Sequence, residues 1–291
     1  MSRGAAVVLG ALALCVLPSA AGASTPRVSH IAVIVMENTE YGSVIGNSNA
    51  PFVNKLARRY GLATRFYGLA HPSLPNYLAL LGGSTFGIAD DCDDCSVNAS
   101  NLMDQLDAAH ISWKAYMEGM PQRCFQSANS GMYTKHHNPF VYFEDIAGKN
   151  DRCSRVVPAD ELTRDMAAGT LPRFVWVTPD KCHDMHDCSV ATGDRYLAGL
   201  VSRLIRALGN HGLVFLTWDE GTTDDGCCSF AAGGHIATLL IGGLVRHGAR
   251  LARPADHYSI LRTIEDLWHL SRLRQAGCAC TPSLVPLLKA R

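Results

Sequence analysis

The sequence predicts an α/β fold with a mostly parallel central sheet, for two reasons. Several short runs are apolar throughout and rich in β-branched residues, which is typical of strands buried on both faces. These runs alternate with amphipathic segments of helical period, as in folds built from β–α units. The 291 residues are 47% hydrophobic and 18% charged, an ordinary globular composition. No repeat, low-complexity tract or linker divides them, so we expect one domain.

The predicted elements begin with a strand at His30–Asn38 (HIAVIVMEN), a continuous β-branched run. A helix follows at Pro51–Gly61, where an amphipathic pattern starts with Pro and ends with Gly. We expect a second helix over Ser100–His110, capped by the hydroxyl of its first residue. The next strand is expected at Ser112–Glu118.

The second half of the chain predicts three more strands and two more helices. Two buried strands are expected at Arg173–Asp180 and Gly212–Gly221, with a helix over Asp194–Leu208 between them. A further apolar run predicts a strand at His235–Gly243. A strongly amphipathic pattern predicts a closing helix over Asp256–Leu270.

The N-terminus has the pattern of a signal peptide. Arg3 provides a positive start, Ala5–Leu17 an apolar stretch, and Ala21–Ala23 a small-residue cleavage site. We therefore expect residues 1–23 to be removed. Residues 24–291 should then form a single domain that is secreted or periplasmic.

Charge and hydropathy count against two classes of partner. Lys plus Arg and Asp plus Glu both number 26, so the formal net charge is zero, and nothing favours nucleic acid. No apolar run after the leader reaches the roughly 18 residues typical of a membrane span. We expect no integral membrane segment after cleavage, and a monomer.

The cysteines favour disulfides. Without Cys15 of the leader, 11 − 1 = 10 remain, an even number in a chain that we expect to be exported. A zinc site is less favoured, because no second half of a zinc motif follows the CDDC stretch. The spacing leaves the connectivity open. The cysteines lie as three close pairs, one distant pair and one adjacent pair: Cys92/Cys95, Cys182/Cys188, Cys278/Cys280, Cys124/Cys153 and Cys227/Cys228.

Acidic residues follow three of the predicted strands. Glu37 and Asn38 end the first, Asp180 ends another, and Asp219 and Glu220 end a third. In open parallel sheets the functional site forms beyond the carboxyl ends of the strands, so these acids should converge on one crevice. Carboxylate and amide oxygens without thiolates suit a hard divalent cation. A solvated acidic loop or a structural calcium loop is the alternative.

The stretch His71–Tyr77, HPSLPNY, places Ser73 between two prolines where a helix begins. A serine hydroxyl beside a divalent cation loses its proton more readily and becomes a nucleophile. The helix N-terminus would favour a phosphate group, and Asn76, one turn on, could donate to a phosphoryl oxygen. Taken alone, Ser73 is more often a helix cap than a nucleophile.

Two histidine-bearing stretches could complete such a site. His137 lies in KHHNPFVYF and His186 in DMHDCS. Either imidazole could stabilise a phosphoryl group or protonate a leaving oxygen. Each one alone is more often an ordinary surface or hydrogen-bonded histidine, and the adjacent His136 competes with His137.

The sequence also resembles a known family across most of the chain. The order and spacing of its motifs are similar to those of the phosphoesterase family of bacterial phospholipases C and acid phosphatases, especially the mycobacterial-type secreted acid phosphatases. The stretch DDGCCSF after Glu220 departs from the family pattern. The motifs are IVMENTEYGSVIG (34–46), HPSLPNYLALLGGSTFG (71–87), KHHNPF (135–140), DMHDCSVATGD (184–194), TWDEG (217–221) and DHYSILRTIEDLW (256–268).

The resemblance implies an alkaline-phosphatase-like fold, with helices on both faces of the sheet. It implies that Ser73 is phosphorylated and then hydrolysed, and that His137 and His186 serve in catalysis and substrate binding. It also implies one divalent metal ion, Ca²⁺, Mg²⁺ or Mn²⁺. The implied metal ligands are Glu37, Asn38, Asp219 and Glu220.

These features predict a secreted, metal-dependent acid phosphatase. Its substrate would be a small-molecule or lipid-headgroup phosphate monoester, hydrolysed through a phosphoserine. A phosphodiesterase or phospholipase C on the same scaffold is the nearest alternative. A metal-free serine esterase using Ser73 is less favoured, because the sequence lacks a G-x-S-x-G elbow around it. A non-catalytic secreted binding protein is the last alternative.

Overall fold

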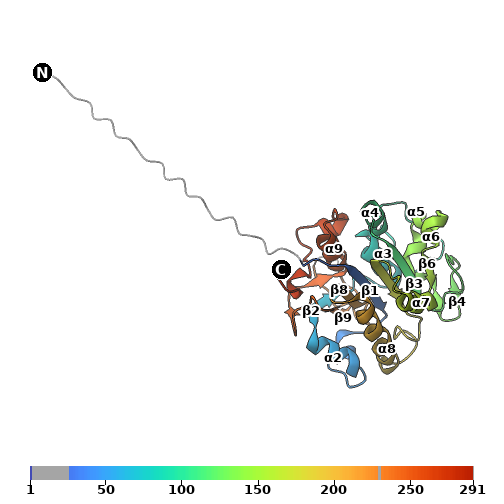
Figure 1. Ribbon diagram of the computed structural model, residues 1–291, viewed down its shortest axis with the longest axis horizontal. Coiled ribbons are helices and arrows are strands. Elements are labelled where there is room, and N and C mark those ends of the chain that lie inside the picture. The colour runs from blue at the N-terminus through green and yellow to red at the C-terminus, as the bar shows by residue number, and fades with distance from the viewer. Residues whose placement is uncertain (2–25, 229–230, 291) are drawn as a thin grey trace.

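One mixed β-sheet organises the computed structural model, which describes residues 1, 26–228 and 231–290 (Figure 1). The predicted signal peptide, apart from Met1, lies outside the described residues. Eight strands follow the order β10-β2-β9-β8-β1-β7-β3-β6, and β11 also pairs with β2. The strands are β1 His30–Met36, β2 Gly61–Tyr67, β3 Trp113–Met117, β6 Val156–Pro158, β7 Phe174–Thr178, β8 Gly212–Trp218, β9 His235–Ile241, β10 Arg250–Leu251 and β11 Ala255–Asp256.

The centre of the sheet is parallel, as predicted. β1 pairs in parallel with both β7 and β8, so that Val33 lies opposite Trp176 on one side and Phe215 on the other. β9 departs from this pattern, because it runs antiparallel to both β8 and β2. The predicted α/β fold with a mostly parallel sheet is confirmed.

The short strands β6, β10 and β11 were not predicted, and two further differences have a local explanation. β2 was not predicted, because Thr64 and Arg65 interrupt its apolar run; a bulge between Ala63 and Phe66 accommodates them. The first strand ends at Met36, two residues earlier than predicted. Asn38 has a φ of 45°, a left-handed conformation outside the β region, so the chain leaves the sheet there.

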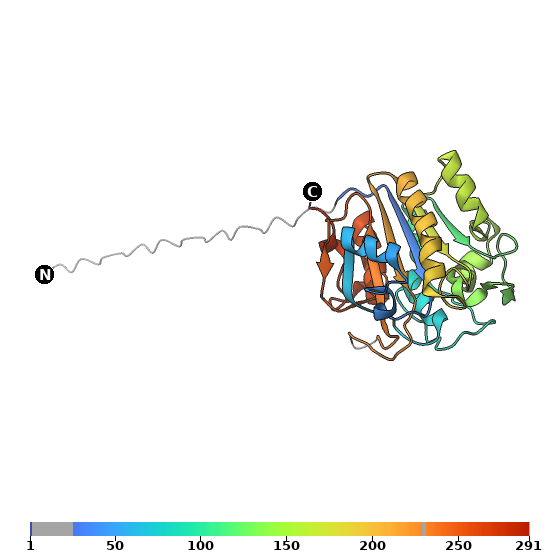
Figure 2. The same cartoon turned by 90° about the horizontal axis from the view of Figure 1, so that it is seen from below.

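Helices cover both faces of the sheet. α2 packs with α8 on one face and α3 with α9 on the other (Figures 1 and 2). The helices are α1 Tyr41–Val44, α2 Pro51–Arg59, α3 Ser73–Gly82, α4 Leu102–Ala108, α5 Glu144–Ala147, α6 Asn150–Cys153, α7 Asp160–Ala168, α8 Val190–Leu208 and α9 His257–Trp268. A small hairpin, β4 Asn129–Ser130 and β5 Tyr133–Thr134, leads into the 3-10 turns η1 Lys135–His137 and η2 Pro139–Tyr142. The turns η3 Arg274–Gly277 and η4 Val285–Leu287 follow α9.

Burial is greatest around β1 and α3. Every residue of Ile31–Met36 has no exposed surface, because the strand has neighbours on both sides and helices on both faces. All ten residues of α3 are buried. A helix without a solvent-exposed face is held on all sides, so its first residue, Ser73, has a fixed position.

The N-termini of α4 and α2 are capped by side chains that the sequence did not predict as caps. α4 begins at Leu102, and its cap is Asn101, which accepts a hydrogen bond from Met103 N at 2.9 Å; the predicted cap, Ser100, was wrong. α2 has Ala50 at its cap position and no side-chain cap of its own. Asp194 of α8 supplies one, accepting from Phe52 N at 3.0 Å and Val53 N at 2.8 Å.

Disulfides close five loops of the described chain. They join Cys92–Cys95, Cys124–Cys153, Cys182–Cys188, Cys227–Cys228 and Cys278–Cys280, a connectivity that the sequence left open. Within the described residues, none of the helices is long and apolar enough to span a bilayer.

Replacing Asp194 by Ala should lower the free energy of unfolding by about 2 kcal/mol, since α2 loses a charged cap that accepts two backbone N–H groups. Chemical denaturation measures this. The matched control is Asp160→Ala, because the Asp160 side chain is 63% exposed and forms a surface ion pair with Arg164; it should change stability by about 0.5 kcal/mol at most. Equal losses in both variants would contradict the capping role.

Candidate active site

Ser73 lies at the N-terminus of α3, directly after Pro72 and two residues before Pro75. Its side chain is buried, and its hydroxyl donates to Glu37 Oε2 at 3.2 Å. Glu37 comes directly after β1. The end of the central strand and the beginning of α3 therefore meet at this hydroxyl–carboxylate contact.

Glu37 contacts three polar side chains. It has no exposed surface. Tyr77 donates its hydroxyl to Oε1, while His137 Nε2 lies 3.3 Å from Oε2. Burial, followed by the charges of Asp219 and Asp184, raises the pKa of Glu37 well above its usual range. Three acidic side chains are thus buried together, which favours the protonated form of Glu37 unless a cation is bound.

Asp219 and Glu220 follow β8 and reach the same point. Asp219 Oδ1 accepts from the backbone N–H of Asn38 at 3.1 Å and of Glu220 at 2.6 Å. Asp219 Oδ2 finds no hydrogen-bond donor among the residues that the structure describes. His257 Nε2 lies 2.5 Å from the main-chain oxygen of Asp219. Burial raises the pKa of Asp219. Burial, followed by the charge of Asp219, raises the pKa of Glu220 to about 9.

The two adjacent histidines of η1 point in different directions. His137 is buried, with Nε2 near Glu37 and Nδ1 3.5 Å from Asp184 Oδ2. His136 instead lies beside Asp91 and Asp93. Burial lowers the pKa of His137 to about 4, so its imidazole is neutral at pH 7. The structure therefore brings His137, and not His136, to Ser73.

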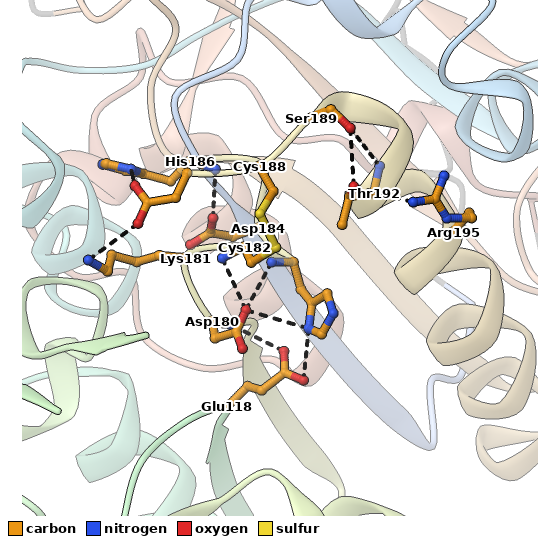
Figure 3. The surroundings of a disulfide bond; sticks show 12 residues. Glu118, Asp180, Lys181, Cys182, Asp184, His186, Cys188, Ser189, Thr192 and Arg195 are labelled. Atoms are coloured by element: carbon orange, nitrogen blue, oxygen red, sulfur yellow. Dashed lines mark hydrogen bonds and ion pairs between the residues drawn. A yellow bond between two sulfur atoms is a disulfide. The ribbon is translucent and has the colours of Figure 1, made fainter. Parts of the chain in front are cut away.

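His186 lies on a loop closed by the Cys182–Cys188 disulfide (Figure 3), and His137 is its neighbour in the site. The two imidazole centres are 5.9 Å apart. Asp184 Oδ1 accepts from the backbone N–H of His186 at 2.8 Å, and Asp187 Oδ1 lies 2.7 Å from His186 Nδ1. Both histidines that the sequence singled out are thus on the same side of the site.

Asp180 does not join the other two strand ends, contrary to the prediction that all three converge. It lies with Glu118 and His183 in a separate group (Figure 3). Its Oδ1 accepts from His183 N at 2.9 Å, and Glu118 Oε1 lies 3.0 Å from His183 Nδ1. Glu118 also lines a cavity of ≈ 410 Å³ between β3, α7 and α8. The chain turns after β7, so that Asp184, four residues after Asp180, lies beside Glu37.

Asn76 stabilises the turn before α3. Its Oδ1 accepts from Leu69 N at 2.7 Å, and its Nδ2 donates to Ala70 O at 2.7 Å and to Pro72 O at 3.3 Å. Both amide hydrogens are used within this turn. A contact between Asn76 and phosphate stays a prediction, and it requires one of these bonds to be exchanged.

The residues present fit a divalent cation. One ligand atom from each of Glu37, His137 and Asp184 lies within 4.8 Å of the others. Asp219 Oδ2, without a hydrogen bond in the described chain, belongs to the same buried acidic group. Several buried carboxylates with few compensating donors favour a bound cation. This group shares Glu37 and Asp219 with the ligand set that the resemblance implies.

Sequence reasoning missed three residues of the site. Tyr77 is in the quoted HPSLPNY stretch and lies four residues after Ser73, on the same helix face. Asp184 is in the quoted DMHDCS stretch, from which only His186 was predicted as a site residue. His71, whose Nδ1 lies 2.7 Å from Glu220 Oε2, opens the Ser73 stretch. Helical spacing alone could have identified Tyr77, but the other two contacts depend on loop geometry.

Comparison with known sequences shows the family to which the chain belongs. A sequence profile of the phosphoesterase family matches residues 46–271. The phosphatidylinositol-3-phosphatase of Mycobacterium tuberculosis is 32% identical over 92% of this chain and 89% of its own length. A probable acid phosphatase of Kluyveromyces lactis is 29% identical over 83% of this chain. The chain spans 58% of that fungal protein.

Solved structures of low sequence identity share the fold. An alkaline-phosphatase-superfamily protein from Vibrio parahaemolyticus superposes with a TM-score of 0.60 at 13% identity, over 88% of this chain and 71% of that one. The phosphonate monoester hydrolase of Agrobacterium radiobacter gives a TM-score of 0.62 at 13% identity, over 89% and 77%. The predicted alkaline-phosphatase-like fold is confirmed.

Without metal, the free energy of unfolding should fall as the pH rises from about 6.5 to 9. Burial raises the pKa of Asp184 to about 8 and of Glu220 to about 9, above the roughly 4 of unfolded carboxyl groups. Their contribution is complete below about pH 4 and is lost progressively as the pH rises from there to these folded-state values. His137 and His257, whose pKa burial lowers to about 4, act oppositely but only below about pH 6.5. Thermal unfolding of chelated protein measures the slope, and a melting temperature that rises across this window would contradict it.

Ca²⁺, Mg²⁺ or Mn²⁺ should raise the melting temperature of chelated protein, most strongly at high pH, because the ligands must be deprotonated. Asp219→Asn should remove most of this gain. Glu265→Gln is the matched control, since burial also raises the pKa of Glu265, to about 8, but this residue is in α9 outside the site. An undiminished gain in Asp219→Asn would exclude Asp219 as a ligand.

Proposed function

Because the chain belongs to the phosphoesterase family and is a phosphoric ester hydrolase, we propose that it is a metal-dependent acid phosphatase with Ser73 as its nucleophile. Its substrates would be phosphate monoesters, including those of small molecules or lipid headgroups. The observation that carries this proposal is the position of the Ser73 hydroxyl, buried at a helix start and 3.2 Å from Glu37. Ser73 is also not the cap residue of α3, because Pro72 takes that position.

Ser73 would attack phosphorus in the first step. Its proton would pass to Glu37 Oε2, to which the hydroxyl already donates, as an oxygen lone pair forms the bond to phosphorus. A P–O bond forms to Ser73 as the bond to the substrate alcohol breaks. The departing oxygen takes a proton from an imidazole, for which the partly exposed His186 is placed at the mouth of the site. Water then hydrolyses the phosphoserine and releases inorganic phosphate.

The surrounding residues would fix the reacting groups. Tyr77 and His137 each contact one of the two oxygens of Glu37, which restricts rotation of the carboxyl group. Asp184 holds the loop that carries His186. Such fixed geometry lowers the barrier by keeping reacting atoms aligned before reaction.

One divalent cation would be held by Glu37, Asn38, Asp219 and Glu220, with His137 and Asp184 beside it. When bound, it would offset negative charge on the phosphoryl oxygens and increase the acidity of the Ser73 hydroxyl. Most of these ligands are carboxylate or amide oxygens, and such ligands support Ca²⁺, Mg²⁺ or Mn²⁺ as the bound ion.

Export and monoester preference are part of the same proposal. Five disulfides in the described chain suit an oxidising compartment, which supports a secreted or periplasmic protein. The names of the two sequence relatives above, a phosphatidylinositol phosphatase and an acid phosphatase, support monoesters over diesters.

Ser73→Ala should lower kcat/KM for p-nitrophenyl phosphate by about 10³-fold or more, because the covalent route is lost. Chelation of wild-type protein should have a comparable effect that added metal reverses. The matched control is Ser43→Ala, since Ser43 is an exposed serine of α1.

The outcomes are separable. Full turnover by Ser73→Ala would exclude the phosphoserine route, while full turnover after chelation would exclude metal dependence. A higher kcat/KM on bis-p-nitrophenyl phosphate than on the monoester would favour a phosphodiesterase.

A further inference from the structure

A carboxylate of the protein already occupies the N-terminal end of α3. Asp91 Oδ1 accepts a hydrogen bond from the backbone N–H of Leu74 at 2.9 Å, and Leu74 directly follows Ser73. Helix N-termini attract anions through their free N–H groups and the helix dipole. Pro75 has no N–H, so the Leu74 amide is one of few donors in this turn. Asp91 therefore takes a position that an anionic group of the substrate would otherwise favour.

Contacts with the 3-10 turns hold Asp91 in place. His136 Nδ1 lies 3.7 Å from Asp91 Oδ2, and its Nε2 lies 2.9 Å from Asp93 Oδ1. The Tyr142 hydroxyl donates to the carbonyl oxygen of Cys92 at 3.0 Å, and the Cys92–Cys95 disulfide closes the loop. Asp91 is thus a fixed charge and not a mobile surface side chain.

The charge of Asp91 acts on the site itself. It contributes to the raised pKa of Glu220, after burial and Asp219. It also partly opposes the effect of burial on the pKa of His137. Both residues contact the site around Ser73, so a substrate bound there would lie within the same field.

Further acidic residues lie beside the partly exposed histidines of the site. Asp187 accompanies His186 and also lies 3.4 Å from Lys181 Nζ. Asp224, whose side chain is 96% exposed, lies 3.9 Å from His71 Nε2. The cationic or potentially cationic side chains named here each have a carboxylate neighbour. They offer little uncompensated positive charge to a second anionic group on a substrate.

We propose that Asp91 determines specificity, so that the site favours phosphate monoesters whose alcohol part is neutral or cationic over those that carry a second negative charge. This inference rests on the proposed phosphomonoesterase activity. The reacting phosphate would be accommodated by the cation-binding acids and histidines. A second anionic group would lie outside that arrangement and within the field of Asp91, where like charges repel.

Three aryl monoesters test this: phenyl phosphate, 4-carboxyphenyl phosphate and 4-(trimethylammonio)phenyl phosphate. Asp91→Asn keeps an oxygen acceptor for Leu74 N–H and removes the charge. It should raise the ratio of kcat/KM for the carboxyphenyl ester to that for phenyl phosphate by about fivefold, the contribution of one unit charge across a partly solvated cleft. It should lower the corresponding ratio for the trimethylammonio ester. Comparing ratios between variants cancels the different reactivities of the three leaving groups.

The matched control is Asp94→Asn, which makes the same change of net charge on the same loop at an exposed residue. Its ratios should stay within about twofold of wild type, because an exposed charge is screened by solvent and salt. Ratios unchanged in Asp91→Asn, or changed equally in both variants, would overturn the role of Asp91 while leaving the phosphatase activity intact. Failure of wild-type protein to hydrolyse phenyl phosphate in a Ser73-dependent manner would overturn the proposed function and this inference together.

Discussion

The buried carboxylate of Glu37 is the group on which the rest of the site depends. It accepts from Ser73 and Tyr77 and lies beside His137, so α3 and the turn η1 both meet the end of β1 at its two oxygens. Burying a negative charge next to Asp219 and Asp184 is unfavourable unless donors or a cation compensate it. These acids are therefore favoured either in their protonated forms or with a cation bound, and a bound cation is compatible with phosphoryl transfer.

The fold provides the rigidity that this arrangement needs. β1 is buried on all sides and ends directly before Glu37, and α3 is buried along its whole length and begins with Ser73. The turn before α3 is held by Asn76, and the 3-10 turn that carries His137 packs against Tyr77. Because the supporting elements lie in the core, the positions of the polar groups follow from packing as much as from their own hydrogen bonds.

The elements that could be predicted from the sequence are those with a local residue pattern. The contacts that were missed depend on the conformation of loops. Continuous apolar runs and amphipathic period were enough for the central strands and the larger helices, but not for β2, whose polar Thr64 and Arg65 are accommodated by a bulge. Strand ends correctly brought Glu37 and Asp219 together, since parallel neighbours end at one edge. They failed for Asp180, because the chain turns after β7 and delivers Asp184 instead. The antiparallel direction of β9 left no signal in its residues.

The phosphoserine mechanism is tested most directly by identifying the atom that accepts the phosphoryl group. Wild-type protein would be mixed with excess p-nitrophenyl phosphate and quenched in acid during turnover, and its peptides mapped by mass spectrometry. We expect one phosphate on the peptide that contains Ser73, attached at that serine. Phosphate found on His137 or His186 instead, or turnover with no phosphorylated peptide, would contradict it.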